Sequence, residues 1–157
     1  MMHIETTRTV LRPFDLSDLD DLQTILGDGQ AMEYLEPPYT LEQTEQFLRQ
    51  FCIERRGALA VEHKTGRQVI GYLLFSDSAE PGVYEMGWIF NRAYWRQGYA
   101  YESCAALIDY AFACLNARKI WAETVDGVRS VGLMKKLGMR PEGSPAQSGM
   151  YVYSIQK

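Results

Sequence analysis

A strand, a long helix and a second strand follow one another in the middle of the chain, and this order constrains the fold more than any other feature. Residues 83–90 predict the first strand, residues 98–115 the helix and residues 119–125 the second strand. The helix carries small and apolar residues at helical spacing: Ala100, Cys104, Leu107, Ala111 and Cys114. Such a unit brings its two strands into one sheet, with the helix across a face. A ligand site is therefore expected at the N-terminus of the helix.

The sequence on either side predicts further elements. A strand is expected at residues 9–14, followed by a helix that Ser17 can cap. A second helix begins after Thr40, with Gln43 in the capping-box position. Strands are also expected at 58–63 and 69–75, a short helix at 130–137, and a terminal hairpin at 139–142 and 150–156. This order predicts one α+β domain over residues 1–157, built in three layers with helices on both faces of a central sheet.

Composition argues against several functional classes. Of the 157 residues, 46% are apolar and 23% are charged, which is typical of a globular domain with a sizeable core. The formal net charge of -4 and the scattered basic residues argue against nucleic-acid binding. No segment reaches the roughly 20 apolar residues of a membrane helix, and the N-terminus lacks a signal-peptide pattern. We therefore expect no membrane association and a cytoplasmic location.

The three cysteines, Cys52, Cys104 and Cys114, occur without a Cys-x-x-Cys pair, and the only histidines, His3 and His63, lie far apart in the sequence. A zinc site needs about four closely arranged ligands, so no metal is expected. Roughly 15 Å of helical rise would separate Cys104 from Cys114, which is too far for a disulfide. Reduced thiols agree with a cytosolic protein.

The start of the long helix, residues 94–102, reads Tyr-Trp-Arg-Gln-Gly-Tyr-Ala-Tyr-Glu. Gly98 and Ala100 are small enough for a ligand to approach the backbone closely. The first turn of a helix exposes amide groups, its dipole favours negative charge, and Arg96 adds a positive charge. The pattern favours a phosphate or diphosphate, although close packing explains the two small residues equally well. Neither a Walker-type phosphate loop nor a Gly-x-Gly-x-x-Gly dinucleotide motif is present.

Three blocks of the sequence resemble the GNAT acetyltransferases. Residues 84–90 (Tyr-Glu-Met-Gly-Trp-Ile-Phe) and 94–100 (Tyr-Trp-Arg-Gln-Gly-Tyr-Ala) resemble the coenzyme A-binding core of that family. Trp95 matches the Tyr-Trp-x-x-Gly-Tyr-Ala pattern of its RimJ/RimL-type branch. Residues 7–14 resemble the first strand of the branch, and residues 130–139 resemble its late helix. Because the blocks occur in the right order along nearly the whole chain, the chain is identified by resemblance as a member of this family.

The resemblance implies a mixed, mostly antiparallel sheet of about six to seven strands with a splayed coenzyme A cleft. It also implies acetyl-coenzyme A as co-substrate and no metal. The pantetheine arm is expected against strand backbone in the opening, where a plain core role is equally compatible. The diphosphate is expected on the amides at the start of the long helix. The implied cofactor-binding residues are Trp88, Ile89, Phe90, Trp95, Arg96, Gln97, Gly98, Tyr99, Ala100, Tyr101 and Ser130.

Two positions of the late helix depart from the family pattern. Family members open this helix with Asn-x-x-Ser or Asn-x-x-Ala, and the Asn position here is Gly127. A tyrosine that acts as general acid in many members is replaced by Met134, which cannot donate a proton. Ser130 is then the nearest matching hydroxyl donor and the candidate catalytic acid, with an ordinary helix N-terminal serine as the alternative. Asp126 or a water is the candidate replacement for the missing Asn side chain.

The implied reaction is direct attack of a neutral amine on the thioester carbonyl, which a backbone N–H polarises. An amine with a pKa of about 10 must first lose a proton at neutral pH. Glu85, on the first splayed strand, is the candidate general base, acting through a water; a solvent-facing strand carboxylate is the alternative. The acceptor is expected near Glu33, Tyr34 and Glu36, which would suit a cationic amine, unless they belong to a packed loop.

These features predict an acetyl-CoA-dependent N-acetyltransferase that acts on a protein N-terminal amine or a small-molecule amine. Within the same class, the alternative is a different acyl donor, or a polyamine or antibiotic as the acceptor. Gly127 and Met134 leave a second reading open, a non-catalytic domain that binds or senses acyl-CoA. Dimers are frequent in the family, so a homodimer is expected by analogy alone.

Overall fold

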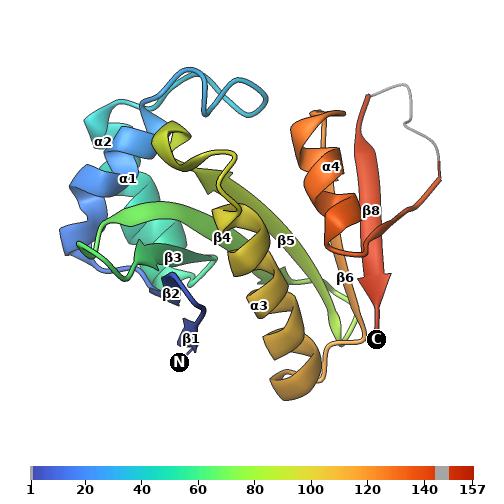
Figure 1. The fold of residues 1–157 in the computed structure, drawn as a ribbon. Coiled ribbons are helices and arrows are strands. Elements are labelled where there is room, and N and C mark those ends of the chain that lie inside the picture. Colours follow the sequence, from blue (N-terminus) through green and yellow to red (C-terminus); the bar gives the residue numbers. More distant parts are fainter. Residues whose placement is uncertain (1, 144–148) are drawn as a thin grey trace.

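The computed structural model describes residues 2–143 and 149–157. Within these residues the chain forms an eight-stranded sheet in the order β1-β2-β3-β4-β5-β6-β8-β7 (Figure 1). The strands are β1 (Ile4–Glu5), β2 (Thr9–Pro13), β3 (Ala58–His63), β4 (Val69–Asp77), β5 (Val83–Phe90), β6 (Lys119–Thr124), β7 (Arg140–Pro141) and β8 (Tyr151–Gln156). All neighbours are antiparallel except β5 and β6, which run parallel. The expected mixed, mostly antiparallel sheet is confirmed.

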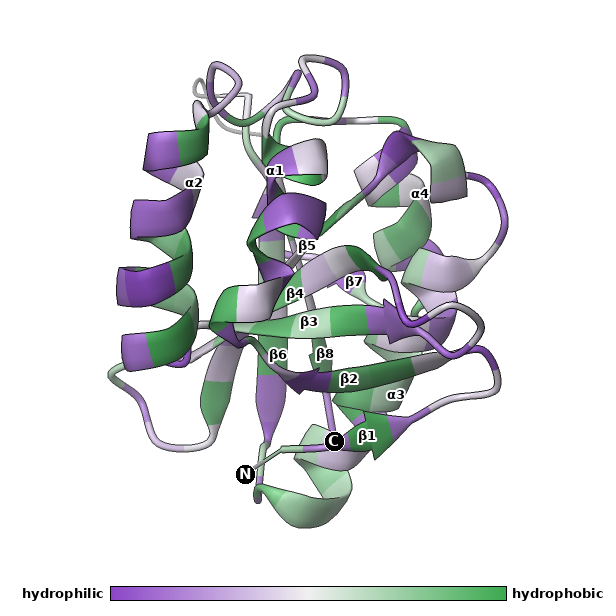
Figure 2. Ribbon diagram, turned by 90° about the vertical axis from the view of Figure 1, so that its left-hand side faces the viewer, coloured by the Kyte–Doolittle hydropathy of each residue, from purple (hydrophilic) through white to green (hydrophobic). Residues whose placement is uncertain are grey.

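Helices cover both faces of the sheet. On one face lie α1 (Leu19–Leu26) and α2 (Leu41–Phe47), which continues as a π-helix (Leu48–Glu54). On the other face lie α3 (Tyr99–Cys114) and α4 (Arg129–Lys136) (Figure 1). Figure 2 shows hydrophilic residues on the outer side of α2 and apolar residues on the side toward the sheet. The three-layer arrangement agrees with the prediction.

Local hydrogen bonds decide where the early helices begin. Asp15, rather than Ser17, provides the first cap, because its side chain accepts from the Ser17 amide over 2.8 Å. Asp18 completes the capping box by accepting from the Asp15 amide over 2.9 Å. A 3-10 turn (Leu16–Asp18) therefore precedes α1. The expected capping box at the start of α2 is confirmed.

Alternate side chains of β5 enter two different cores. Met86 and Phe90 lie in the core beneath α3 and α4, whereas Ile89 lies in the core beneath α1 and α2. Because strand side chains alternate with a period of two, Glu85 and Gly87 share the face of Ile89. The candidate base therefore lies on the α1/α2 side of the sheet.

The parallel pair β5–β6 separates partway along its length. Both strands lie wholly within the described residues, and their paired positions are Val83 with Lys119, Tyr84 with Ile120, and Glu85 with Trp121. Beyond Glu85, β5 keeps its β4 neighbour as far as Phe90, which pairs with Gly71. The free side of β5 then borders an opening, so the expected splay is confirmed.

Differences from the prediction fall on short elements. The described residues form eight strands in place of six or seven, because the sequence analysis did not predict β1, which contains only two residues and leaves no periodic signal. The first strand of the expected terminal hairpin shrinks from 139–142 to Arg140–Pro141. Residues 144–148, between the two expected hairpin strands, lie outside the described residues.

Candidate active site

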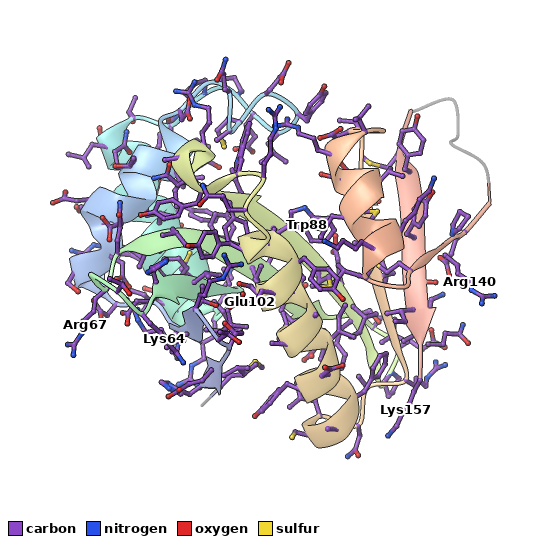
Figure 3. All side chains as sticks on the ribbon, viewed as in Figure 1. Lys64, Arg67, Trp88, Glu102, Arg140 and Lys157 are labelled. Atoms are coloured by element: carbon purple, nitrogen blue, oxygen red, sulfur yellow. The ribbon has the colours of Figure 1, made fainter. Side chains whose placement is uncertain are left out.

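A cleft of about 450 Å³ opens where β5 and β6 separate. This volume falls within the range of roughly 300–1,000 Å³ that is common for small-molecule sites. Its walls are the free part of β5, the loop and first turn of α3, the end of β6, the start of α4 and a segment ahead of α2. Trp88 lies on β5, between α3 and α4 in Figure 3.

The loop before α3 presents unpaired amides to this cleft. Arg96 (φ 62°) and Gly98 (φ 83°) adopt left-handed backbone conformations, and Gln97 between them does not. Alternation of this kind turns successive N–H groups toward one side and forms anion-binding nests. Within residues 2–143 and 149–157, no amide from Arg96 to Tyr101 donates to a protein acceptor. With the α3 dipole behind it, the loop fits a diphosphate.

The predicted cofactor residues gather at the cleft, with one exception. Those that line it are Trp88, Ile89, Phe90, Trp95, Arg96, Gly98, Tyr99, Ala100, Tyr101 and Ser130. Gln97 is the exception, because its side chain donates to the Ala93 carbonyl over 3.0 Å and its own carbonyl accepts from Arg8. Of its groups, the backbone amide is the one left for the predicted role.

Trp95 closes one end of the free β5 edge. Its indole Nε1 donates to the Phe90 carbonyl over 2.9 Å, so a ligand would have to compete for this carbonyl. Arg129, from the start of α4 on the opposite wall of the cleft, packs on the same indole ring. Its guanidinium carbon lies 4.3 Å from a Trp95 ring centroid. The backbone of Trp88 and Ile89 is left as the predicted pantetheine contact.

The end of β6 and the start of α4 form the opposite wall, which includes Glu123, Thr124, Asp126 and Arg129. The Asp126 side chain accepts from the amides of Val128 and Arg129, both over 3.0 Å, and thereby fixes the turn that leads into α4. Its second oxygen lies 3.3 Å from Arg129 Nε. Asp126 is thus engaged in holding α4, which makes it a poor replacement for the missing Asn side chain.

The two departures from the family pattern have structural reasons. A Cβ atom at Gly127 would lie 2.8 Å from the Tyr151 hydroxyl, so Tyr151 fills the space that an Asn side chain needs. Met134 is fully buried in the core, and the side chain that lines the cleft one turn after Ser130 is Leu133. Neither the Met134 side chain nor the Leu133 side chain can donate a proton. Ser130 lines the cleft in the first turn of α4.

Glu85 lies beside the cleft rather than in its lining. It occupies the last paired position before the strands separate, and Gly87, next on the same face, does line the cleft. Burial raises the pKa of Glu85, and the charge of Glu123 raises it further. A carboxyl with a raised pKa, close to a cleft, can accept a proton through a water.

The predicted acceptor residues are only partly brought together. Tyr34 lines the cleft. Glu33 stays at the rim, with Oε2 3.8 Å from Arg129 Nη2. Glu36 lies beside Tyr39, where burial and then the Glu36 carboxylate raise the pKa of Tyr39 to about 12. The prediction for Glu36 therefore has the least support from the geometry.

A family model described as the acetyltransferase (GNAT) domain matches residues 8–140. The chain belongs to the GNAT acetyltransferases. It is 31% identical over 144 residues to a Bacillus subtilis protein named uncharacterized N-acetyltransferase YnaD, covering 90% of this chain and 85% of that protein. It resembles a GNAT-family acetyltransferase structure from Bacillus anthracis with a TM-score of 0.90 at 26% identity, covering 99% and 98% of the two chains. A structure of RimL, a ribosomal L7/L12 alpha-N-protein acetyltransferase in complex with coenzyme A, matches with a TM-score of 0.81 at 20% identity, covering 99% and 98%.

This GNAT protein is an N-acetyltransferase, as the sequence predicts. At 20% identity, the likeness to RimL shows that the two chains share a fold. None of the helices within residues 2–143 and 149–157 combines the length and apolar character needed to cross a membrane. In the same part of the chain, His, Cys, Asp and Glu side chains form no group suited to hold a metal ion.

The sequence prediction for this GNAT cleft omits most of one wall. The omitted lining residues are Ala31, Leu35, Gly87, Glu123, Thr124, Arg129, Leu133 and Lys136. Those at the end of β6 could have been inferred, because parallel neighbours end at the same edge of a sheet. Arg129 and Lys136 carry no such signal, since their places depend on how α4 packs.

Proposed function

We propose that this GNAT enzyme binds acetyl-CoA in the cleft between β5 and β6 and transfers the acetyl group to a primary amine. The observation that carries the proposal is the meeting of an amide-rich loop at the N-terminus of α3 with the free edge of β5. The loop suits a diphosphate, and a free strand edge suits the amide groups of pantetheine. The likeness to RimL, solved with coenzyme A, supports this reading.

Different residues of the cleft would bind the diphosphate and the pantetheine arm of acetyl-CoA. Arg96 and the amides from Gly98 to Tyr101 would hold the diphosphate, because they supply a positive charge and unpaired donors. The backbone of Trp88 and Ile89 would hold the pantetheine arm. Bound acetyl-CoA supplies a thioester carbonyl that an amine can attack directly.

Glu85 and Ser130 are the proposed proton-transfer groups. The acceptor must be a neutral amine to attack, so its proton must leave first. Glu85 would accept that proton through a water, since its raised pKa makes it a stronger base than an ordinary carboxylate. Ser130, which lines the cleft from α4, would donate a hydrogen bond to the departing thiolate.

For the acceptor we propose the free N-terminal amine of a peptide or protein. Tyr34 and Leu35 line the cleft and remain 46% and 58% exposed, and Val125 and Val128 are exposed next to the cleft-lining end of β6. Exposed apolar side chains around a cleft suit the side chains of a peptide, whereas a polyamine has less apolar surface to bury. Glu123 adds a negative charge for the approaching ammonium group.

Release of free thiol from acetyl-CoA, measured across an amine panel, tests the proposal. The panel contains a peptide with a free N-terminus, the same peptide with a blocked N-terminus and an internal lysine, spermidine and an aminoglycoside. We expect turnover on the free N-terminus. Turnover on spermidine alone would contradict the acceptor assignment. Binding of acetyl-CoA without turnover on any amine would favour the sensing domain instead.

We also propose a cytoplasmic location and a homodimer. Cys52 and Cys104 are buried free thiols and Cys114 is an exposed one, which suits a reducing compartment. The homodimer rests on family analogy alone. Sedimentation equilibrium tests it, and a mass of 18.0 kDa at all concentrations would contradict it.

A further inference from the structure

Arg8 contacts the loop before α3 but does not line the cleft. It lies in the tight turn between β1 and β2, where the Thr6 amide donates to the Thr9 carbonyl over 2.9 Å. Its Nη1 donates to the carbonyl of Gln97 over 3.0 Å. A side chain from the start of the chain thus reaches the predicted diphosphate loop, which lies far away in the sequence.

Glu102 holds the Arg8 guanidinium in place from the first turn of α3. Glu102 Oε1 accepts from Arg8 Nε over 2.8 Å, and Oε2 accepts from the Arg8 amide over 2.8 Å and from the Thr6 hydroxyl over 2.5 Å. Figure 3 labels Glu102 on α3. Although burial opposes ionisation, these hydrogen bonds lower the pKa of Glu102 below its ordinary value. The carboxylate is therefore ionised near neutral pH and offsets the charge of Arg8.

Tyr99 and Gly98 fix the remaining sides of the guanidinium. Its central carbon lies 3.9 Å from the centroid of the Tyr99 ring. The Tyr99 hydroxyl lies 2.9 Å from His63 Nε2, which anchors that ring on β3. At Gly98, a Cβ atom would lie 3.3 Å from Arg8 Nη2. Arg8 therefore has one well-defined position against the loop.

We infer that Arg8 is a positioning residue that holds the backbone of the diphosphate loop in its binding conformation. The Gln97 carbonyl and the Gly98 N–H belong to one peptide unit, and every peptide in the described residues is trans. In a trans peptide these two groups point in opposite directions. A carbonyl bonded to Arg8 therefore turns the Gly98 N–H away from Arg8 and toward the cleft that Gly98 lines. The inference rests on the proposed acetyl-CoA site and adds a residue outside it.

Geometry, rather than charge, distinguishes this role. Glu102 offsets the charge of Arg8, so the pair adds little net attraction for a phosphate. The planar fork of arginine, in contrast, bonds the Gln97 carbonyl and the Glu102 carboxylate at once while stacking on Tyr99. Lysine keeps the charge but cannot reproduce this set of contacts. Arg8→Lys therefore removes the contacts that orient the loop backbone while it keeps the positive charge at position 8.

The test compares the wild type with Arg8→Lys. Calorimetry measures the Kd of coenzyme A for each protein. Steady-state kinetics measures kcat/KM for acetyl-CoA and for S-acetylpantetheine, which lacks the diphosphate. Arg12→Lys is the matched control, because Arg12 also forks between two carboxylates, Asp18 and Glu62, but among the described residues forms no hydrogen bond or ion pair with the loop. For Arg8→Lys we expect coenzyme A to bind roughly tenfold more weakly, about 1.4 kcal/mol. We expect no matching loss with S-acetylpantetheine.

The outcomes separate the possible failures. An unchanged Kd in Arg8→Lys, or equal losses with acetyl-CoA and S-acetylpantetheine, would overturn the positioning role. A similar loss of affinity in Arg12→Lys would show that general destabilisation is the cause, and would also overturn it. If the wild type itself does not bind coenzyme A, the proposed function fails before Arg8 is tested. Should Arg8→Lys fold poorly, Glu102→Gln provides a second comparison, because it weakens the hold on the guanidinium while leaving the charge of Arg8 unopposed. Weaker coenzyme A binding despite this added positive charge supports the positioning role, and binding as tight as in the wild type or tighter overturns it.

Discussion

Gly98→Ala is the substitution that most directly tests the diphosphate loop. Gly98 has φ 83°, a conformation in which a Cβ atom costs roughly 1–2 kcal/mol. The added methyl group would also lie 3.3 Å from Arg8 Nη2, which is tighter than ordinary contact. The loop can relieve both strains by rotating its peptides away from the cleft. A lost hydrogen bond to a charged group costs about 1.5–3 kcal/mol, so we expect the Kd of coenzyme A to rise roughly tenfold or more.

Gly66→Ala is the control for this experiment. Gly66 has nearly the same φ, 82°, but nothing lies within 4 Å of its Cβ position, in a turn outside the cleft. Both substitutions should lower Tm by about 2–4 °C for each kcal/mol of strain in a chain of this size. Calorimetric titration should show weaker coenzyme A binding for Gly98→Ala alone. If both variants lose stability and Gly98→Ala still binds like the wild type, the diphosphate does not lie on this loop.

Three further changes test the roles around the cleft. Glu85→Gln should lower kcat by about 10²–10⁴-fold at pH values where the wild-type carboxylate is ionised. Because burial and Glu123 raise the pKa of Glu85, wild-type kcat should fall as pH drops through that raised value, and an identical pH profile in Glu85→Gln would remove Glu85 from the mechanism. Ser130→Ala should lower kcat by up to about 10²-fold with little change in the Kd of coenzyme A, and wild-type kcat would leave Ser130 as an ordinary helix residue. Arg129→Ala removes the contact with Glu33 at the rim and the packing on Trp95, so steady-state kinetics should show a higher KM for the amine and for acetyl-CoA; unchanged KM values for both would contradict this role.

The central strand–helix–strand unit was predictable because each of its elements is long enough to show a period. β5 and α3 have nearly the bounds expected from the sequence. The two-residue strand β1 is set by pairing with β2, and no local pattern marks it, whereas β7 was expected but two residues longer than it is. The cap at Asp15 was missed because Asp15 and Ser17 are both good capping residues, and only the hydrogen bonds distinguish them.

Prediction of the candidate site was good on one wall of the cleft and poor on the other. The loop at Arg96 and Gly98 has a local sequence signature, and the structure gives it the expected unpaired amides. Arg129 reaches the cleft through the packing of α4, which sequence spacing alone does not determine. The rotation of the same helix buries Met134 and turns Leu133 to the cleft, a difference of one residue.

The role of Arg8 could not be predicted from the sequence either, because its partners lie about 90 residues away along the chain. Its contacts with Gln97 and Glu102 exist because the turn between β1 and β2 lies against the start of α3. Nothing in the local sequence pairs these residues. Long-range ion pairs of this kind become visible only once the sheet order is known.

A crystal structure of the chain with coenzyme A bound would test the central claim most directly. The account predicts the diphosphate on the amides between Arg96 and Tyr101, and the pantetheine arm along Trp88 and Ile89 between β5 and β6. Coenzyme A bound elsewhere, with these amides turned away from it, would contradict the account.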